Sequence, residues 1–108
     1  MLFKVVFRVL VPAGTDKLYL TGSHPALGSW SADGIRLECC SDNFTAAIEL
    51  PTGEYEYKYT RGSWDTVEKG KSGEELKNRR LIVKTGMVKD DDVLAFADNF
   101  SQPGTVQK

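Results

Sequence analysis

Apolar and polar residues alternate along most of the chain. In residues 2–11 one face of the expected strand carries Phe3, Val5, Phe7, Val9 and Val11. Lys4 and Arg8 lie on the other face. Residues 54–60 repeat the pattern, with three tyrosines on one side and charged side chains on the other. A period of two is typical of half-buried β-strands. The pattern therefore predicts a protein built from strands.

Turn signals divide these runs into about seven short strands. The Pro12-Ala-Gly14 and Pro51-Thr-Gly53 segments are typical chain reversals. The strands are expected near residues 2–11, 18–21, 35–38, 43–50, 54–60, 79–85 and 93–96. We expect residues 61–77 to form a long irregular loop that can include a short hairpin at 65–68, and Asp90-Asp-Asp92 to form a solvated turn. The fold class is all-β, an antiparallel β-sandwich, with a five-stranded barrel as the alternative.

The length of 108 residues fits a single domain. No long helical pattern and no internal repeat interrupts the strand pattern. We assign residues 1–100 to one module and residues 101–108, which include a Pro-Gly pair, to a flexible tail or linker.

Composition narrows the classes of partner. The chain has 14 basic and 15 acidic residues and a formal net charge of −1, so we expect no nucleic-acid partner. No apolar run approaches the roughly 20 residues that span a bilayer, so we expect no membrane partner. The first residues lack the features of a signal peptide, which favours a cytoplasmic location or a fragment of something larger.

The residues that commonly perform catalysis do not form a recognisable set. The chain has one histidine, His24, which lies in a loop where no sequence motif indicates a catalytic nucleophile beside it. Acidic pairs such as Glu74-Glu75 lie in polar runs where burial would not raise their pKa. Cys39 and Cys40 are adjacent, which disfavours a disulfide bridge, and with His24 they lack zinc-ligand spacing. We expect neither an enzyme nor a metal or cofactor site.

Two tryptophans stand outside the alternating pattern. Trp30 and Trp64 each lie in a loop of small and polar residues. Each ring either folds back over the core or offers a flat surface to a ligand, such as the apolar face of a sugar ring. Lys58, at the end of the tyrosine strand, and Asn78, which ends the long loop, have hydrogen-bonding groups that suit sugar hydroxyls. Each of these two residues is equally compatible with a structural role, as a surface ion pair or a turn residue.

Three segments resemble one known family. Residues 18–30 read LYLTGSHPALGSW, residues 56–59 read EYKY and residues 77–79 read KNR. In this order they resemble the starch-binding domains of carbohydrate-binding module family 20, which are related to the glycogen-binding modules of AMP-activated kinase β subunits. The resemblance runs from about Phe3 to about Phe96.

The resemblance implies an immunoglobulin-like β-sandwich that binds α-1,4-glucans, namely starch, glycogen or maltooligosaccharides, and has no catalytic activity. Trp30 matches the first stacking ring of the family's main site, while Lys58 and Asn78 match its hydrogen-bonding residues. Trp64 is assigned to the second ring because its spacing from Lys58 is close to that in the kinase-type modules. Tyr19 matches one aromatic residue of a second site whose partner tyrosine is missing, so one site is expected.

Two further expectations concern partners. Modules of this family usually accompany a catalytic domain on the same polypeptide, so such a domain is an expected partner. The alternative interpretation is a β-sandwich that mediates protein contacts and has lost glucan binding or binds glucan weakly. The changed spacing of the second tryptophan and the missing partner of Tyr19 motivate that alternative.

Overall fold

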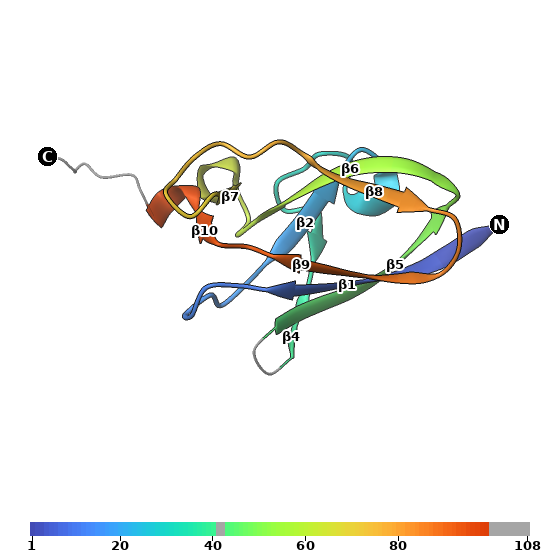
Figure 1. Ribbon diagram of the computed structural model, residues 1–108, viewed down its shortest axis with the longest axis horizontal. Helices are drawn as coiled ribbons and strands as arrows, with labels where there is room; N and C mark the ends of the chain where they lie inside the picture. The colour runs from blue at the N-terminus through green and yellow to red at the C-terminus, as the bar shows by residue number, and fades with distance from the viewer. Residues whose placement is uncertain (41–42, 100–108) are drawn as a thin grey trace, which may run out of the picture.

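The computed structural model describes residues 1–40 and 43–99. The predicted tail, residues 101–108, lies outside the described residues. The described part contains ten strands and three short 3-10 helices (Figure 1). The strands are β1 (Leu2–Leu10), β2 (Tyr19–Gly22), β3 (Ile35–Arg36), β4 (Glu38–Cys40), β5 (Asn43–Pro51), β6 (Gly53–Thr60), β7 (Glu68–Lys69), β8 (Arg79–Val83), β9 (Met87–Asp92) and β10 (Ala95–Phe96). The 3-10 helices are η1 (Pro25–Leu27), η2 (Trp64–Thr66) and η3 (Ala97–Asn99).

The strands form two four-stranded sheets that pack face to face. One sheet has the order β4-β5-β1-β9 and the other β3-β2-β6-β8. Figure 1 shows β6 and β8 in one layer and β1, β5 and β9 in the other. Every strand pair in these sheets is antiparallel except β1 and β9, which run parallel. The prediction of an all-β sandwich is confirmed.

The alternating residues of the two sheets fill the space between them. Phe7 of β1 meets Tyr57 of β6 edge-to-face, with ring centroids 5.4 Å apart. Tyr57 and Tyr59 are fully buried, as the alternation of β6 predicts. Such aromatic pairs stabilise a core by about 0.5–1.5 kcal/mol beyond the area that they bury. The outer face of β6 is left to its charged residues, and this face carries several of the candidate site residues.

Three sequence-based expectations are wrong in detail. Residues 90–92 end β9 rather than forming a turn, and Asp91 is only 9% exposed. No hairpin forms at residues 65–68, because η2 and the start of β7 occupy this segment. The predicted strand at 35–38 is split between the two sheets at Leu37, whose buried side chain joins the core. Asp91 and Leu37 are buried by long-range contacts that override the local pattern, whereas η2 is capped locally by Ser63 and Thr66.

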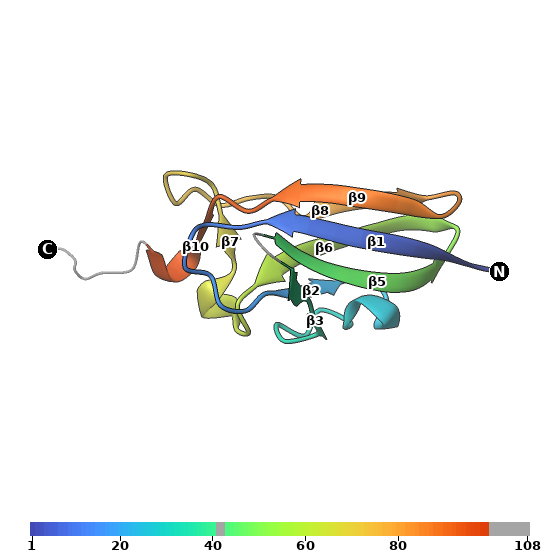
Figure 2. The ribbon, with the colours of Figure 1, turned by 90° about the horizontal axis from the view of Figure 1, so that it is seen from below.

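The last predicted strand is shorter than expected and lies elsewhere. Within residues 93–96 only Ala95 and Phe96 are extended, and they pair with β7 instead of closing a large sheet. Figure 2 shows this small sheet at one end of the molecule. No helix in residues 1–40 and 43–99 is long and apolar enough to cross a membrane.

Candidate functional site

The loop after β2 carries Trp30. The η1 helix begins at His24, whose Nδ1 accepts a hydrogen bond from the Ala26 N–H at 3.0 Å. Pro25 occupies the first helical position, where its missing N–H costs nothing. Leu27 is fully buried and anchors the helix to the core. The Gly28 N–H donates to the Pro25 carbonyl and ends the helix, and Trp30 follows two residues later. Hydrogen bonds at both ends of η1 therefore fix the loop that leads to Trp30.

The backbone of Trp30 adopts a conformation that is rare for a large residue. Ser29 and Trp30 have φ angles of 48° and 63°, in the left-handed region. The Trp30 N–H donates to the Gly22 carbonyl at 2.9 Å, which ties the residue to the end of β2. The Trp30 side chain is half-buried. Left-handed conformations of bulky residues persist where the surrounding structure enforces them and are enriched at functional sites.

A contact between two glycines shapes this loop. A Cβ atom added to Gly34 would lie 2.9 Å from the Gly28 Cα, and one added to Gly28 would lie 2.6 Å from the Gly34 Cα. Real side chains do not tolerate such distances, so the loop closes only with glycine at both positions. The close approach holds the two ends of the segment that contains Trp30 together.

Lys58 and Asn78 lie side by side on the outer face of the β3-β2-β6-β8 sheet. Lys58 follows Tyr57, which pairs with Arg79, and Asn78 directly precedes Arg79. The Lys58 ammonium donates to the Leu76 carbonyl at 2.6 Å. The Asn78 Nδ2 donates to the Glu56 carboxylate at 3.0 Å. Within residues 1–40 and 43–99, Lys58 forms no ion pair with Glu54 or Glu56, so the alternative of a surface ion pair with these residues is not observed.

Sequence reasoning missed Glu56 as a candidate site residue. Its exposed carboxylate accepts the Asn78 hydrogen bond, and its backbone N–H donates to the Ser23 Oγ at 3.0 Å. The signal was present, because residues two apart on a strand share a face and Glu56 lies two positions before Lys58.

Trp64 begins η2, beyond the end of β6, and its side chain is 46% exposed. Ser63 and Thr66 cap this helix reciprocally. Arg61 holds the segment in place, because its guanidinium lies 4.8 Å from the Phe96 ring centroid and pairs with Asp98. The exposure of Trp64 excludes the interpretation of this ring as a buried lid on the core.

A hydrogen bond at the end of β6 joins the chain that follows Trp30 to the chain that precedes Trp64. The Thr60 Oγ1 donates to the Ala32 carbonyl at 2.5 Å, which links the chain shortly after Trp30 to the chain shortly before Trp64. The helices η1 and η2 lie apart along the long axis in both Figure 1 and Figure 2, and the segment after η1 runs back towards η2. One hydrogen bond thus couples the two loops.

Tyr19 lies on the same sheet, opposite Thr60. Its half-buried ring faces the Arg36 guanidinium at 5.9 Å from the centroid. A Cβ atom on Gly62 would contact the ring at 3.4 Å, so the chain after β6 passes close to it. The Tyr19 ring therefore lies close to Arg36 and Gly62 within the protein. Its assignment to a second glucan site stays a prediction.

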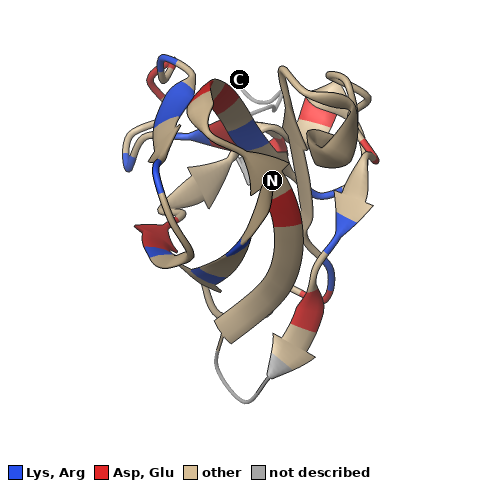
Figure 3. Cartoon of the chain, turned by 90° about the vertical axis from the view of Figure 1, so that its right-hand side faces the viewer, with Lys and Arg blue, Asp and Glu red and all other residues tan. Residues whose placement is uncertain are grey.

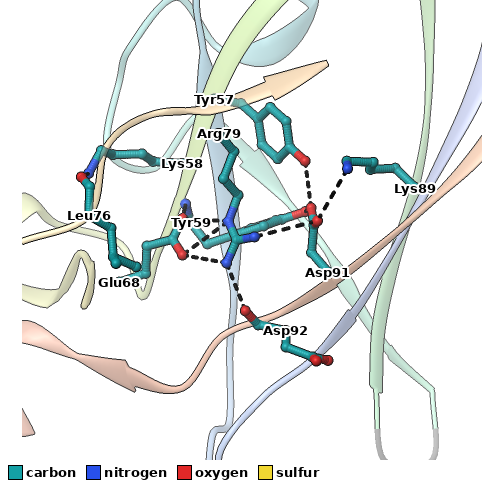
Figure 4. A network of polar contacts seen from close by, with 9 residues as sticks. All are labelled: Tyr57, Lys58, Tyr59, Glu68, Leu76, Arg79, Lys89, Asp91 and Asp92. Atoms are coloured by element: carbon teal, nitrogen blue, oxygen red, sulfur yellow. Dashed lines mark hydrogen bonds and ion pairs between the residues drawn. The ribbon is translucent and has the colours of Figure 1, made fainter. Parts of the chain in front are cut away.

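A buried polar network fixes the start of β8 and therefore the position of Asn78 (Figure 4). The Arg79 guanidinium donates to both oxygens of Glu68, which is 1% exposed, and to the Asp92 carbonyl at 2.7 Å. Glu68 also accepts the Tyr59 N–H at 3.0 Å. A two-pronged bond of this kind fixes geometry as well as adding energy. Because Asn78 directly precedes Arg79, the network holds the candidate site residue in register.

Asp91 forms the other half of the network. The hydroxyls of Tyr57 and Tyr59 donate to one Asp91 oxygen at 2.6 and 2.8 Å, and an Arg79 nitrogen lies 3.4 Å from the other. Burial, reinforced by the neighbouring Asp91 charge, raises the pKa of both tyrosines well above the usual value. These groups stay protonated over the whole neutral range, so their role is structural.

The chain has nearly equal numbers of basic and acidic residues, 14 and 15. Figure 3 shows basic and acidic residues interspersed around the end of the molecule that faces the viewer. Within residues 1–40 and 43–99, no group of three potential metal ligands is close enough to hold an ion. The candidate site offers a half-buried indole, an ammonium, an amide and a carboxylate. These groups can stack on and hydrogen-bond to a neutral, hydroxyl-rich ligand.

The fold is that of a β-sandwich with two four-stranded sheets. The sequence profile of the starch-binding domain family matches residues 2–92. The chain belongs to this family, whose members are non-catalytic carbohydrate-binding modules. The predictions of the family and of a carbohydrate-binding module rather than an enzyme are confirmed.

Relatives of known function are much longer proteins. An amylopullulanase of Thermoanaerobacter thermohydrosulfuricus is 36% identical over 103 residues, which cover 88% of this chain and 7% of the amylopullulanase. An alpha-amylase of Niallia circulans is 43% identical over 89 residues, covering 76% of this chain and 7% of the amylase. The chain thus spans a small fraction of the length of the curated relatives that it matches.

Solved structures support the fold. The family 20 carbohydrate-binding module of the maltotetraose-forming amylase from Pseudomonas saccharophila has a TM-score of 0.60 and 24% identity, covering 82% of this chain and 98% of that one. The glucoamylase of Hormoconis resinae has a TM-score of 0.66 and 21% identity, covering 99% of this chain and 19% of that one. At these identities the similarity demonstrates a shared fold.

Proposed function

We propose that this chain binds α-1,4-glucan chains of starch, glycogen or maltooligosaccharides through the surface around Trp30. The indole serves as the stacking platform for a glucose ring, and Trp64 serves as a second platform. Lys58 and Asn78 hydrogen-bond to sugar hydroxyls. The observation that carries this proposal is the enforced left-handed backbone of Trp30, which places a half-buried aromatic ring in a loop tied to the end of β2.

The internal contacts of the polar residues leave hydrogen-bonding capacity for a ligand. An ammonium has three donors, and Lys58 uses one on the Leu76 carbonyl. Asn78 uses one N–H on Glu56 and keeps a second N–H and its carbonyl oxygen. These internal contacts orient both side chains before a ligand arrives, which reduces the entropy lost on binding.

Binding is expected to be weak because the surface is open. Hydroxyl hydrogen bonds largely replace hydrogen bonds to water, so ring stacking decides the affinity. We expect a Kd on the order of 10 μM to 1 mM, or about −4 to −7 kcal/mol. The curated relatives are large amylases, which supports a role in holding a catalytic domain of the same polypeptide on the polymer and so raising the local substrate concentration.

Titration calorimetry with maltoheptaose tests the proposal. Trp30→Ala is expected to weaken binding about tenfold or more, because a buried aromatic anchor commonly contributes over 1–2 kcal/mol. Leu10→Ala is the control, since Leu10 is 52% exposed on the other sheet. Equal affinity of folded Trp30→Ala and wild type would contradict the proposal. Failure of the folded wild type to bind starch or glycogen would favour the protein-contact alternative.

A further inference from the structure

A small cavity adjoins the candidate site on the outer face of the β3-β2-β6-β8 sheet. Its volume is about 270 Å³, and it is lined by Ser23, Glu54, Tyr55, Glu56 and Arg80. Pockets for drug-sized ligands measure about 300–1,000 Å³, so this cavity suits a single sugar ring. Glu56 belongs both to this cavity and to the hydrogen bond with Asn78.

The cavity and the Trp30 loop share a rigid boundary. Gly22 accepts the Trp30 N–H, and the next residue, Ser23, exchanges two hydrogen bonds with Glu56. The Ser23 N–H donates to the Glu56 carbonyl at 2.9 Å, and the Glu56 N–H donates to the Ser23 Oγ at 3.0 Å. The backbone of Trp30 is therefore bonded to the residue that directly precedes Ser23, which lines the cavity together with Glu56.

The lining has the chemistry of a sugar subsite. Arg80 pairs with Glu54 at 2.6 Å through one nitrogen, while both side chains are 64% exposed. A guanidinium has five N–H donors, so most of them stay available to hydroxyl oxygens. The Glu56 carboxylate and the Ser23 hydroxyl supply acceptors and a donor. Two carboxylates against one guanidinium disfavour an anionic ligand and favour neutral hydroxyls.

We propose that this cavity is a subsite for a glucose unit beyond the two that stack on Trp30 and Trp64, with Glu56 and Arg80 as its hydrogen-bonding residues. The inference rests on the proposed glucan-binding function and specifies the direction in which the bound glucan chain crosses the surface. The glucan chain runs from Trp30 past Glu56 to Arg80. The subsite should then increase affinity only for oligosaccharides long enough to reach it.

The test compares maltose with maltoheptaose in calorimetric titrations of the whole chain. Arg80→Ala and Glu56→Gln are expected to weaken maltoheptaose binding about fivefold each, the effect of one hydrogen bond, and maltose binding less than twofold. Glutamine at position 56 keeps an acceptor for Asn78 while removing the charge. Arg8→Ala is the matched control, because Arg8 forms a comparable exposed pair with Asp90 on the other sheet.

The outcomes separate this inference from the proposed function. If Trp30→Ala loses binding while Arg80→Ala and Glu56→Gln bind maltoheptaose like the wild type, the subsite is wrong and the proposed function stands. Equal weakening for both sugars would also overturn the subsite. If Trp30→Ala binds like the wild type, both proposals fail.

A second measurement needs no variant. In NMR spectra of the wild type, maltoheptaose should shift the Ser23 amide and Arg80 side-chain resonances, and maltose should leave them unchanged. Unshifted resonances with saturating maltoheptaose would overturn the inference.

Discussion

Replacing Glu68 by glutamine should destabilise the fold more than any exposed charge change. Glu68 is 1% exposed and receives three hydrogen bonds from the Arg79 guanidinium and one from the Tyr59 backbone. Glutamine has nearly the same size but no charge, so the variant leaves a partly buried guanidinium without its main counter-ion. The loss follows from uncompensated charge rather than from a cavity.

The magnitude follows from what Arg79 retains. Breaking a buried ion pair by removing one partner costs about 3–5 kcal/mol. Arg79 keeps the Asp92 carbonyl at 2.7 Å and Asp91 at 3.4 Å, and its side chain is 23% exposed. These contacts reduce the expected cost to about 2–3 kcal/mol. With a urea slope of about 1–3 kcal/mol/M, the midpoint should fall by about 0.7–3 M.

Urea unfolding followed by tyrosine and tryptophan fluorescence measures this change. Glu54→Gln is the control, because Glu54 forms an exposed pair with Arg80 that is worth about 0–1 kcal/mol. The Glu68→Gln variant should also weaken glucan binding modestly, since Asn78 directly precedes Arg79. A Glu68→Gln midpoint equal to that of Glu54→Gln would refute the reasoning that the network stabilises the fold.

Two further predictions concern pH and the Trp30 loop. The folded-state pKa of Tyr57 and Tyr59 is raised mainly by burial, so their contribution to stability is complete below about pH 10, the unfolded value, and is lost as the pH rises above it. Urea midpoints from pH 8 to 11 should decrease above pH 10, and a flat profile would contradict this assignment. The Gly34→Ala variant should weaken maltoheptaose binding several-fold by displacing Trp30, because the added Cβ would lie 2.9 Å from a backbone carbon. Its control is Gly86→Ala, where the nearest atom is 3.4 Å away, and equal binding by the two variants would contradict a positioning role.

The strand pattern of the sequence was sufficient to predict the sandwich. In β6 the tyrosines point into the core and Lys58 points outward, as the alternation requires. Local pattern failed where a charged residue is buried by distant partners. Asp91 stands in a run of three aspartates that is typical of a solvated turn, yet hydroxyls of Tyr57 and Tyr59 hold it inside the protein. The residues next to Asp91 in sequence do not indicate that distant tyrosine hydroxyls will bind it.

The candidate site also has features that the sequence predicts and features that it does not predict. The segment that ends in Trp30 is a recognisable motif, and the structure gives it an enforced backbone conformation. Lys58 and Asn78 lie together because β6 and β8 are neighbours. Their actual partners, the Leu76 carbonyl and Glu56, depend on how the long loop folds back over the sheet. Periodicity cannot predict the path of a loop of this length.

The most direct test of the account is a crystal structure of the protein with a bound maltooligosaccharide. We expect a glucose ring stacked on the Trp30 indole, with sugar hydroxyls within hydrogen-bonding distance of Lys58 and Asn78. A sugar bound on another face, with Trp30 untouched, would contradict the central claim that this loop is built to present its ring to a glucan.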